Sequence, residues 1–202
     1  MLDLFTKGGP VMWPLLATSL VAVSVVIERL LFTFIEKRRR DSSSVEACLK
    51  AAEEGRMEEA ARLAEQSQDF VARALAFALT HPSGSFSEAM LRGARRELRR
   101  FNRGLSALDT IVTLAPLLGL LGTVTGMIHA FGLLGTQELG TPAAITGGIA
   151  QALIATAFGL GIAITALIPF NYLNTQLENA REDLEDAATR LEMILKPTFN
   201  PG

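Results

Sequence analysis

Cysteine, tryptophan and tyrosine each occur only once among the 202 residues. The lone Cys48 excludes a disulfide bond within the chain and a metal site built from cysteines. Because it falls among alanine and leucine residues of a predicted helix, we expect it to be a small core residue. The sequence also lacks a paired nucleophile and base, a metal-ligand cluster and a phosphate-binding loop. We therefore expect a protein that is not an enzyme and needs no cofactor.

Asp, Glu, Lys and Arg are absent from two long runs, 110–135 and 143–170. Both runs exceed the roughly 20 apolar residues that a helix needs to cross a bilayer. A third apolar run, 11–35, is interrupted by Glu28 and Arg29. A cleaved signal peptide is the alternative for this run, but its basic residues follow the apolar stretch and no Ala-x-Ala site ends it. The predicted fold class is all-α: a polytopic membrane protein with three transmembrane helices, two of them extended into a helical cytoplasmic domain.

The orientation of the predicted helices follows from the basic residues. Lys and Arg gather at 37–40 and 92–103, whereas the segment 136–142 contains neither. By the positive-inside rule the N-terminus is then periplasmic and the C-terminus cytoplasmic. The basic clusters could also be nucleic-acid patches, but their place beside membrane spans favours topology, so no nucleic-acid partner is expected. The predicted organisation is an outer-face segment (1–10), transmembrane helix 1 (11–35), a cytoplasmic helical domain (36–106), transmembrane helix 2 (107–135), a periplasmic loop (136–142), transmembrane helix 3 (143–172) and a cytoplasmic amphipathic helix with a tail (173–202).

The polar part of the chain is predicted to be helical. Short ones are predicted over 45–54, 57–66 and 69–80, and nothing breaks the helical pattern between Ser85 and Pro116. Transmembrane helix 2 is therefore predicted to continue into the cytoplasm as one rod. The C-terminal helix carries an apolar seam that should pack on this rod, in the same or an adjacent subunit, with its acidic residues facing arginines. The seam consists of Leu173, Leu177, Ala180, Leu184, Ala187, Leu191 and Ile194.

Small residues recur at spacings of three and four in both uncharged runs. Such spacing lets transmembrane helices approach closely, so these residues are predicted to form helix-packing edges. A tightly packed bundle of any function is the alternative explanation. The edges are Gly119, Gly122 and Gly126 in the first run and Gly148, Ala152 and Gly159 in the second.

Few polar side chains in these runs could take part in proton movement. A proton relay normally depends on an ionisable group deep in the membrane. His129 lies about 28 Å along the helix from Thr110, at the outer interface, where a histidine is usually solvated. Thr123 and Thr156 lie within about 10 Å of the midplane. They could line a pore or merely bond a backbone carbonyl of their own or a neighbouring helix.

The segments 115–131 and 148–160 resemble the two signature helices of the MotA/TolQ/ExbB proton-channel family, closest to its ExbB/TolQ-like branch. The opening Gly8-Gly9-Pro10-Val11-Met12-Trp13-Pro14-Leu15-Leu16 and the sequence Ile27-Glu28-Arg29-Leu30 also resemble ExbB-like members. The resemblance implies that Thr123 and Thr156 line a central pore.

Gln151 departs from the family pattern, which typically has Glu at this place. A neutral amide can exchange hydrogen bonds but cannot store a proton. Gln151 lies five residues before Thr156 and points about 140° away from it on an ideal helix. Either the helix is distorted near Gly147 and Gly148, or the two side chains face different surfaces. We keep Gln151 as a third candidate for the proton pathway.

The resemblance further implies a function and partners. The chain would be the ring-forming subunit, a homopentamer, of a proton-driven motor in the bacterial inner membrane. Two copies of an ExbD- or TolR-like single-span subunit would supply a membrane aspartate, and the motor would act on a TonB/TolA-like effector. A non-conducting structural scaffold and a self-sufficient ion channel are the alternatives. The latter would need its own selectivity group or an internal repeat, and the sequence offers neither.

Overall fold

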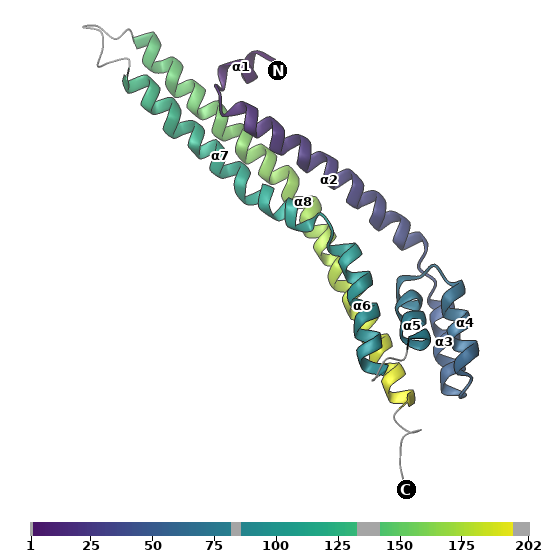
Figure 1. Cartoon of the computed structure of the whole chain (residues 1–202). Coiled ribbons are helices and arrows are strands. Elements are labelled where there is room, and N and C mark those ends of the chain that lie inside the picture. Colours follow the sequence, from purple (N-terminus) through teal and green to yellow (C-terminus); the bar gives the residue numbers. More distant parts are fainter. Residues whose placement is uncertain (1, 82–85, 133–141, 196–202) are drawn as a thin grey trace. The chain divides into compact units, whose positions relative to one another are not determined.

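The computed structural model describes residues 2–81, 86–132 and 142–195 (Figure 1). Within these ranges every regular element is a helix, which confirms the predicted all-α class. The predicted loop 136–142 lies outside the described residues except for Pro142, where the last helix begins. The helices are α1 (Leu2–Lys7), α2 (Met12–Arg38), α3 (Ser42–Glu53), α4 (Met57–Gln66), α5 (Phe70–Thr80), α6 (Phe86–Asn102), α7 (Leu105–Gly132) and α8 (Pro142–Leu195).

The chain forms two compact units. Unit 1 comprises Met1–Arg29 and Gly104–Tyr172, and unit 2 comprises Leu30–Arg103 and Leu173–Gly202. Helices α2 and α8 each contribute residues to both units. Among the described residues, three stretches of helix are long and apolar enough to cross a membrane: Met12–Arg38, Phe86–Gly132 and Thr146–Leu195. The predicted number of spanning helices is therefore confirmed.

The structure differs from the predicted continuous rod at one point. A turn at Arg103 and Gly104 separates α6 from α7. Gly104 has a φ of +79°, a left-handed conformation that residues with a Cβ rarely adopt. A Cβ on Gly104 would also lie only 3.0 Å from Cγ1 of Val25 in α2. Glycine at this position thus allows both the interruption of the helix and the close approach of α2.

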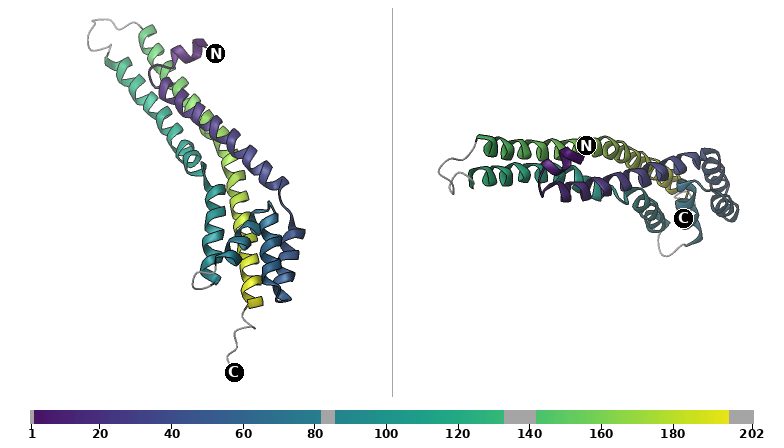
Figure 2. Two further views of the ribbon diagram at one scale, coloured as in Figure 1. Left: turned by 45° about the vertical axis from the view of Figure 1, so that its right-hand side comes forward. Right: turned by 90° about the horizontal axis from the view of Figure 1, so that it is seen from above.

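Unit 1 is a bundle of α2, α7 and α8. Figures 1 and 2 show α7 and α8 side by side along this unit. Glycine and alanine residues lie where the two helices are in contact. One core cluster places Met12 and Leu15 of α2, with Val11 just before this helix, against Ala155 of α8. Large apolar side chains point outward instead of inward; Ile168, for example, is 71% exposed. An outer surface of this kind suits lipid or further protein and not water.

Unit 2 has a conventional buried core built from α3 to α6 and the C-terminal part of α8. Cys48 is fully buried there, as predicted, and burial raises the pKa of its thiol to about 11. The predicted seam residues Leu184 and Leu191 belong to the same core. The C-terminal helix therefore packs on the whole α3–α6 group, and not on the extension of transmembrane helix 2 alone, because α3 to α5 fold over it within one core.

Three carboxylates are buried in unit 2, and each has an arginine partner. Asp69, which is 0% exposed, accepts hydrogen bonds from Arg40 (2.6 Å) and from the backbone N–H groups of Asp41 and Val71 (2.7 Å each). Arg73 lies 2.7 Å from Glu97, and Arg100 lies 3.0 Å from Glu36. Paired in this way, the buried acids hold the helices of unit 2 together.

Replacing Asp69 with alanine should destabilise unit 2 strongly. The substitution leaves the backbone N–H groups of Asp41 and Val71 without their acceptor, and Arg40 keeps only its ion pair with Asp183 at 2.9 Å. We expect a loss of about 3 kcal/mol, which lowers the unfolding midpoint by about 10 °C. Circular dichroism of the full chain in detergent measures that midpoint. Glu65→Ala is the matched control, because Glu65 is exposed. Equal shifts in the two variants would contradict a structural role for Asp69.

Candidate functional site

Glycines set the distance between α7 and α8. A Cβ on Gly159 would lie 2.5 Å from the carbonyl oxygen of Ala115, and a Cβ on Gly119 would lie 3.0 Å from Cα of Thr156. Both distances are shorter than ordinary van der Waals contacts, so only a hydrogen at these positions permits the observed approach. The structure brings the six predicted packing residues to this contact: Gly119, Gly122, Gly126, Gly148, Ala152 and Gly159.

The hydroxyl of Thr156 makes a hydrogen bond between the two helices. Its Oγ1 donates to the carbonyl oxygen of Gly119 on α7 at 2.9 Å, and the side chain is half-buried. In an α-helix the same carbonyl accepts the backbone N–H of Thr123, four residues later. The carbonyl of Gly119 therefore uses both of its lone pairs, and the absence of a side chain on Gly119 is what lets Thr156 reach it.

Thr123 lies on the neighbouring part of α7. Its Oγ1 donates to the carbonyl oxygen of Leu120 at 2.6 Å. The two threonine hydroxyls are thus bound to the carbonyls of consecutive residues, one from within α7 and one from α8. Thr123 also lines a shallow hollow in the surface of α7 together with Val124, Met127 and Ile128.

The hydrogen-bonding capacity that remains on these hydroxyls is that of an acceptor. A hydroxyl has one proton and two lone pairs, and in both threonines the proton is already directed at a backbone carbonyl. As they stand, Thr123 and Thr156 can accept a hydrogen bond from a neutral carboxylic acid. To donate to an ionised carboxylate, each hydroxyl must first rotate away from its carbonyl.

Gln151 does not join the two threonines. Its side-chain amide lies against Gly9, in the turn between α1 and α2, where a Cβ would overlap the amide nitrogen. Gly9 has a φ of +75°, which again favours glycine. Helix α8 is continuous through Gly147 and Gly148, so Gln151 and Thr156 face different neighbours on a regular helix: the N-terminal turn and α7, respectively.

Other titratable groups lie away from the threonines. In the described part of the two uncharged runs the one titratable side chain is His129, which is exposed. The buried acids Glu36, Asp69 and Glu97 belong to unit 2 and are ion-paired. Among the described residues no group of three or more His, Cys, Asp or Glu side chains could hold a metal ion. Of the two threonines, Thr156 makes its hydrogen bond across the α7–α8 contact, and Thr123 makes its own within α7.

The sequence analysis missed the cluster of buried acids and arginines in unit 2. Glu97 is flanked by arginines on both sides, and the sequence predicts for this run only a cytoplasmic location and a contact with the acidic C-terminal helix. One available indication was the spacing of three between Glu97 and Arg100, which pairs them at 2.7 Å on one helix face. The contacts with Arg73 and Glu36 join different helices, so helical periodicity alone does not predict them.

Comparison with known proteins places this chain in a family. Residues 62–186 match the model of the MotA/TolQ/ExbB proton channel family. A putative biopolymer transport protein, ExbB-like 1, of Synechocystis is 37% identical, over 98% of this chain and 80% of that protein. A putative ExbB homolog of Methanothermobacter thermautotrophicus is 30% identical, over 98% of this chain and 68% of that protein. The Tol-Pal system protein TolQ of Haemophilus influenzae is 34% identical, over 54% of this chain and 51% of its own.

Proposed function

We propose that this chain forms a ring and that its threonines assist a carboxylic acid supplied by a second protein. The chain is a multi-pass membrane protein and belongs to the MotA/TolQ/ExbB proton channel family. The proposal is based on two hydrogen bonds: the hydroxyl of Thr156 donates to the carbonyl oxygen of Gly119, and the hydroxyl of Thr123 donates to that of Leu120. They lie in a stretch of α7 and α8 that contains no carboxylate of its own. A proton path through this stretch therefore needs an acid from elsewhere.

The hydrogen bonds of the threonines suit both protonation states of such an acid. The neutral acid donates its O–H to a hydroxyl oxygen, which has free lone pairs. Once the acid ionises, each hydroxyl can rotate and donate to the carboxylate instead. Rotation costs little, because Gly119 and Leu120 keep the helical hydrogen bonds of their carbonyls. An ionised acid in an apolar pore costs several kcal/mol, and a charge-assisted hydrogen bond offsets roughly 1.5–3 kcal/mol of that.

The complete assembly in this proposal is a homopentamer. Its pore holds the single membrane helices of two ExbD- or TolR-like subunits, each with an aspartate at the level of the threonines. The basic residues at 37–40 and 92–103 support an orientation in the bacterial inner membrane with the N-terminus periplasmic. Each proton that crosses 100 mV releases about 2.3 kcal/mol. That energy would move the partner helices and, through them, a TonB/TolA-like effector.

Gln151 has a different role in this proposal. Its contact with the turn at Gly9 supports a function in holding the N-terminal segment on α8, outside the proton pathway. The pathway then consists of Thr123, Thr156 and the acid of the partner. A glutamate at position 151 is not needed for proton transfer at the α7–α8 contact.

Reconstitution in lipid vesicles tests the proposal directly. We expect vesicles with this chain alone to retain an imposed pH gradient. Addition of a single-span partner that carries a membrane aspartate should speed its decay by about tenfold or more, and Asp→Asn in the partner should abolish the effect. Full conduction by the chain alone would identify a self-sufficient channel. A stable complex that never conducts would identify a scaffold.

A further inference from the structure

One face of α6 is a row of exposed arginines. Residues at spacings of three, four and seven share a helix face, and all four arginines here are exposed. Arg92 has an ion pair, with Glu88 of its own helix at 3.4 Å. Among the described residues no carboxylate lies within ion-pair distance of the other three. We call this face the arginine stripe: Arg92, Arg95, Arg96 and Arg99.

The C-terminal part of α8 carries the opposite charge on its outer face. The acids there recur at spacings of four, seven and eight, and all are exposed. They lie opposite the buried residues Ala180, Leu184 and Leu191. Arg181 lies 3.7 Å from Glu178 and 3.5 Å from Glu185, and the charge of Arg190 acts on Asp186. We call this face the acidic stripe: Glu178, Glu182, Glu185 and Asp186.

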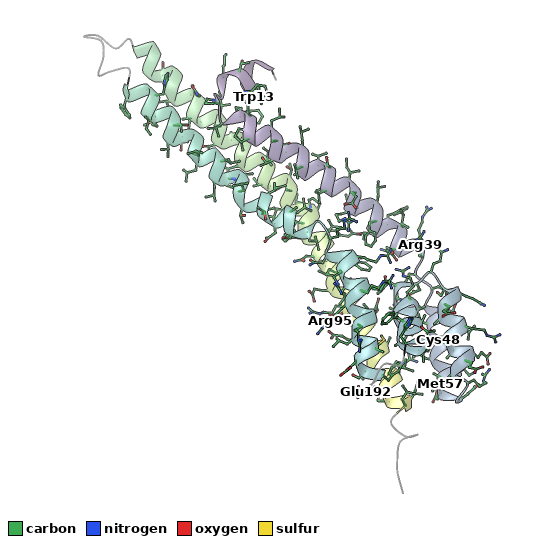
Figure 3. All side chains as sticks on the ribbon, viewed as in Figure 1. Trp13, Arg39, Cys48, Met57, Arg95 and Glu192 are labelled. Atoms are coloured by element: carbon green, nitrogen blue, oxygen red, sulfur yellow. The ribbon has the colours of Figure 1, made fainter. Side chains whose placement is uncertain are left out.

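Among the described residues no ion pair joins the two stripes, although both belong to unit 2 and Arg95, labelled on α6 in Figure 3, lines one hollow with Glu178 and another with Glu185. The first of these hollows, of about 520 Å³, gathers the cations Arg95, Arg99 and Arg181 around one acid, Glu178, and the second places Arg95 and Arg181 beside Glu185 and Glu192. Like charges held this close repel each other. An additional acidic group from outside the chain would relieve the repulsion.

We propose that the arginine stripe of one copy of this chain binds the acidic stripe of the next copy. This inference rests on the proposed ring. The stripes match in length, since they run about 10 Å and 12 Å along their helices at ~1.5 Å per residue. Each copy offers both, on different helices, so the contact is head-to-tail, the kind of contact from which closed rings are built when the rotation between copies closes. Exposed ion pairs add little energy singly, so the stripes chiefly select the partner face and set its register.

An anionic membrane surface is the competing partner for the arginine stripe. Lipid headgroups would neutralise the arginines but would repel the acidic stripe of the same unit. A second copy satisfies both stripes at once. The same contact accounts for two complementary surfaces on one chain, which headgroup binding does not.

Charge reversal in two variants of this chain tests the contact. Variant A carries Arg95→Glu with Arg99→Glu, and variant B carries Glu182→Arg with Asp186→Arg. Expressed alone, each variant brings like charges together at every contact, and we expect the ring fraction to fall about tenfold. Expressed together under different tags, A and B offer complementary stripes to each other. We expect them to copurify as mixed rings at a yield well above that of either variant alone, measured by size exclusion with light scattering in mild detergent. The yield should stay below that of the wild type, because a ring of five copies keeps at least one contact between two copies of the same variant.

The outcomes distinguish a failure of the proposed stripe contact from a failure of the proposed ring. Lys50→Glu with Arg62→Glu is the matched control, because both cations are exposed in unit 2 outside the stripe; it should leave the ring intact. A contact within one chain, or binding to lipid, would not be rescued by mixing A with B, and that result overturns the proposal. Intact rings in A alone and B alone also overturn it. A wild-type chain that is monomeric would instead refute the proposed ring.

Discussion

Replacing Thr156 with valine will slow proton-driven turnover by roughly 10- to 150-fold while the complex stays assembled. Valine keeps the shape of threonine and removes the hydroxyl. The partner's carboxylate then loses one hydrogen bond to a charged group, worth about 1.5–3 kcal/mol. The bond between α8 and Gly119 is lost as well, but interhelical hydrogen bonds in membranes average only about 0.6 kcal/mol. The decay of a pH gradient in vesicles that contain both proteins measures the rate.

Two further variants make this result specific. Thr165→Val is the matched control: Thr165 is also on α8, but its hydroxyl donates to carbonyls of its own helix, those of Gly161 and Ile162. It should conduct at the wild-type rate. Thr156→Ser restores a hydroxyl and should recover most of the activity. If Thr156→Val and Thr165→Val behave alike, the hydroxyl of Thr156 has no part in proton transfer and the proposed pathway is wrong.

Adding one methyl group at Gly159 will disrupt the contact between α7 and α8, whereas the same change two residues later will not. A Cβ at position 159 would lie 2.5 Å from the carbonyl oxygen of Ala115 and 2.9 Å from Cα of Gly119, both backbone atoms that cannot move independently of α7. Forcing extra volume into a packed interior costs about 1–3 kcal/mol. For Gly161, by contrast, a Cβ would meet no atom within 4 Å.

Thermal unfolding in detergent compares the two substitutions. Gly159→Ala should lower the midpoint by about 2–12 °C for a chain of this size, and Gly161→Ala should leave it close to the wild-type value. Proton conduction should fall with the first variant, because Thr156 is positioned by the same contact with Gly119. A stable, fully active Gly159→Ala protein would show that α7 and α8 are not as close as described.

Local patterns were sufficient for much of the architecture. The uncharged runs identify the spanning helices, because a bilayer requires length and apolarity that are visible residue by residue. The start of α4 and the position of Cys48 in a helical core followed from helical periodicity alone. Predictions failed where one residue changes the backbone. The helix pattern continues through 103 and 104, yet Gly104 in a left-handed conformation ends α6 there.

The sequence by itself determined which residues are in these helices, which faces are small and which are charged. Only the tertiary structure decided what each face meets. It directs Thr156 to the carbonyl of Gly119 and Gln151 to the turn at Gly9, and it places Arg95 of α6 in one hollow with Glu178 of α8 and in another with Glu185. The physical reason is that periodicity defines directions around one helix axis, whereas a contact depends on how two axes are packed, which distant residues determine together.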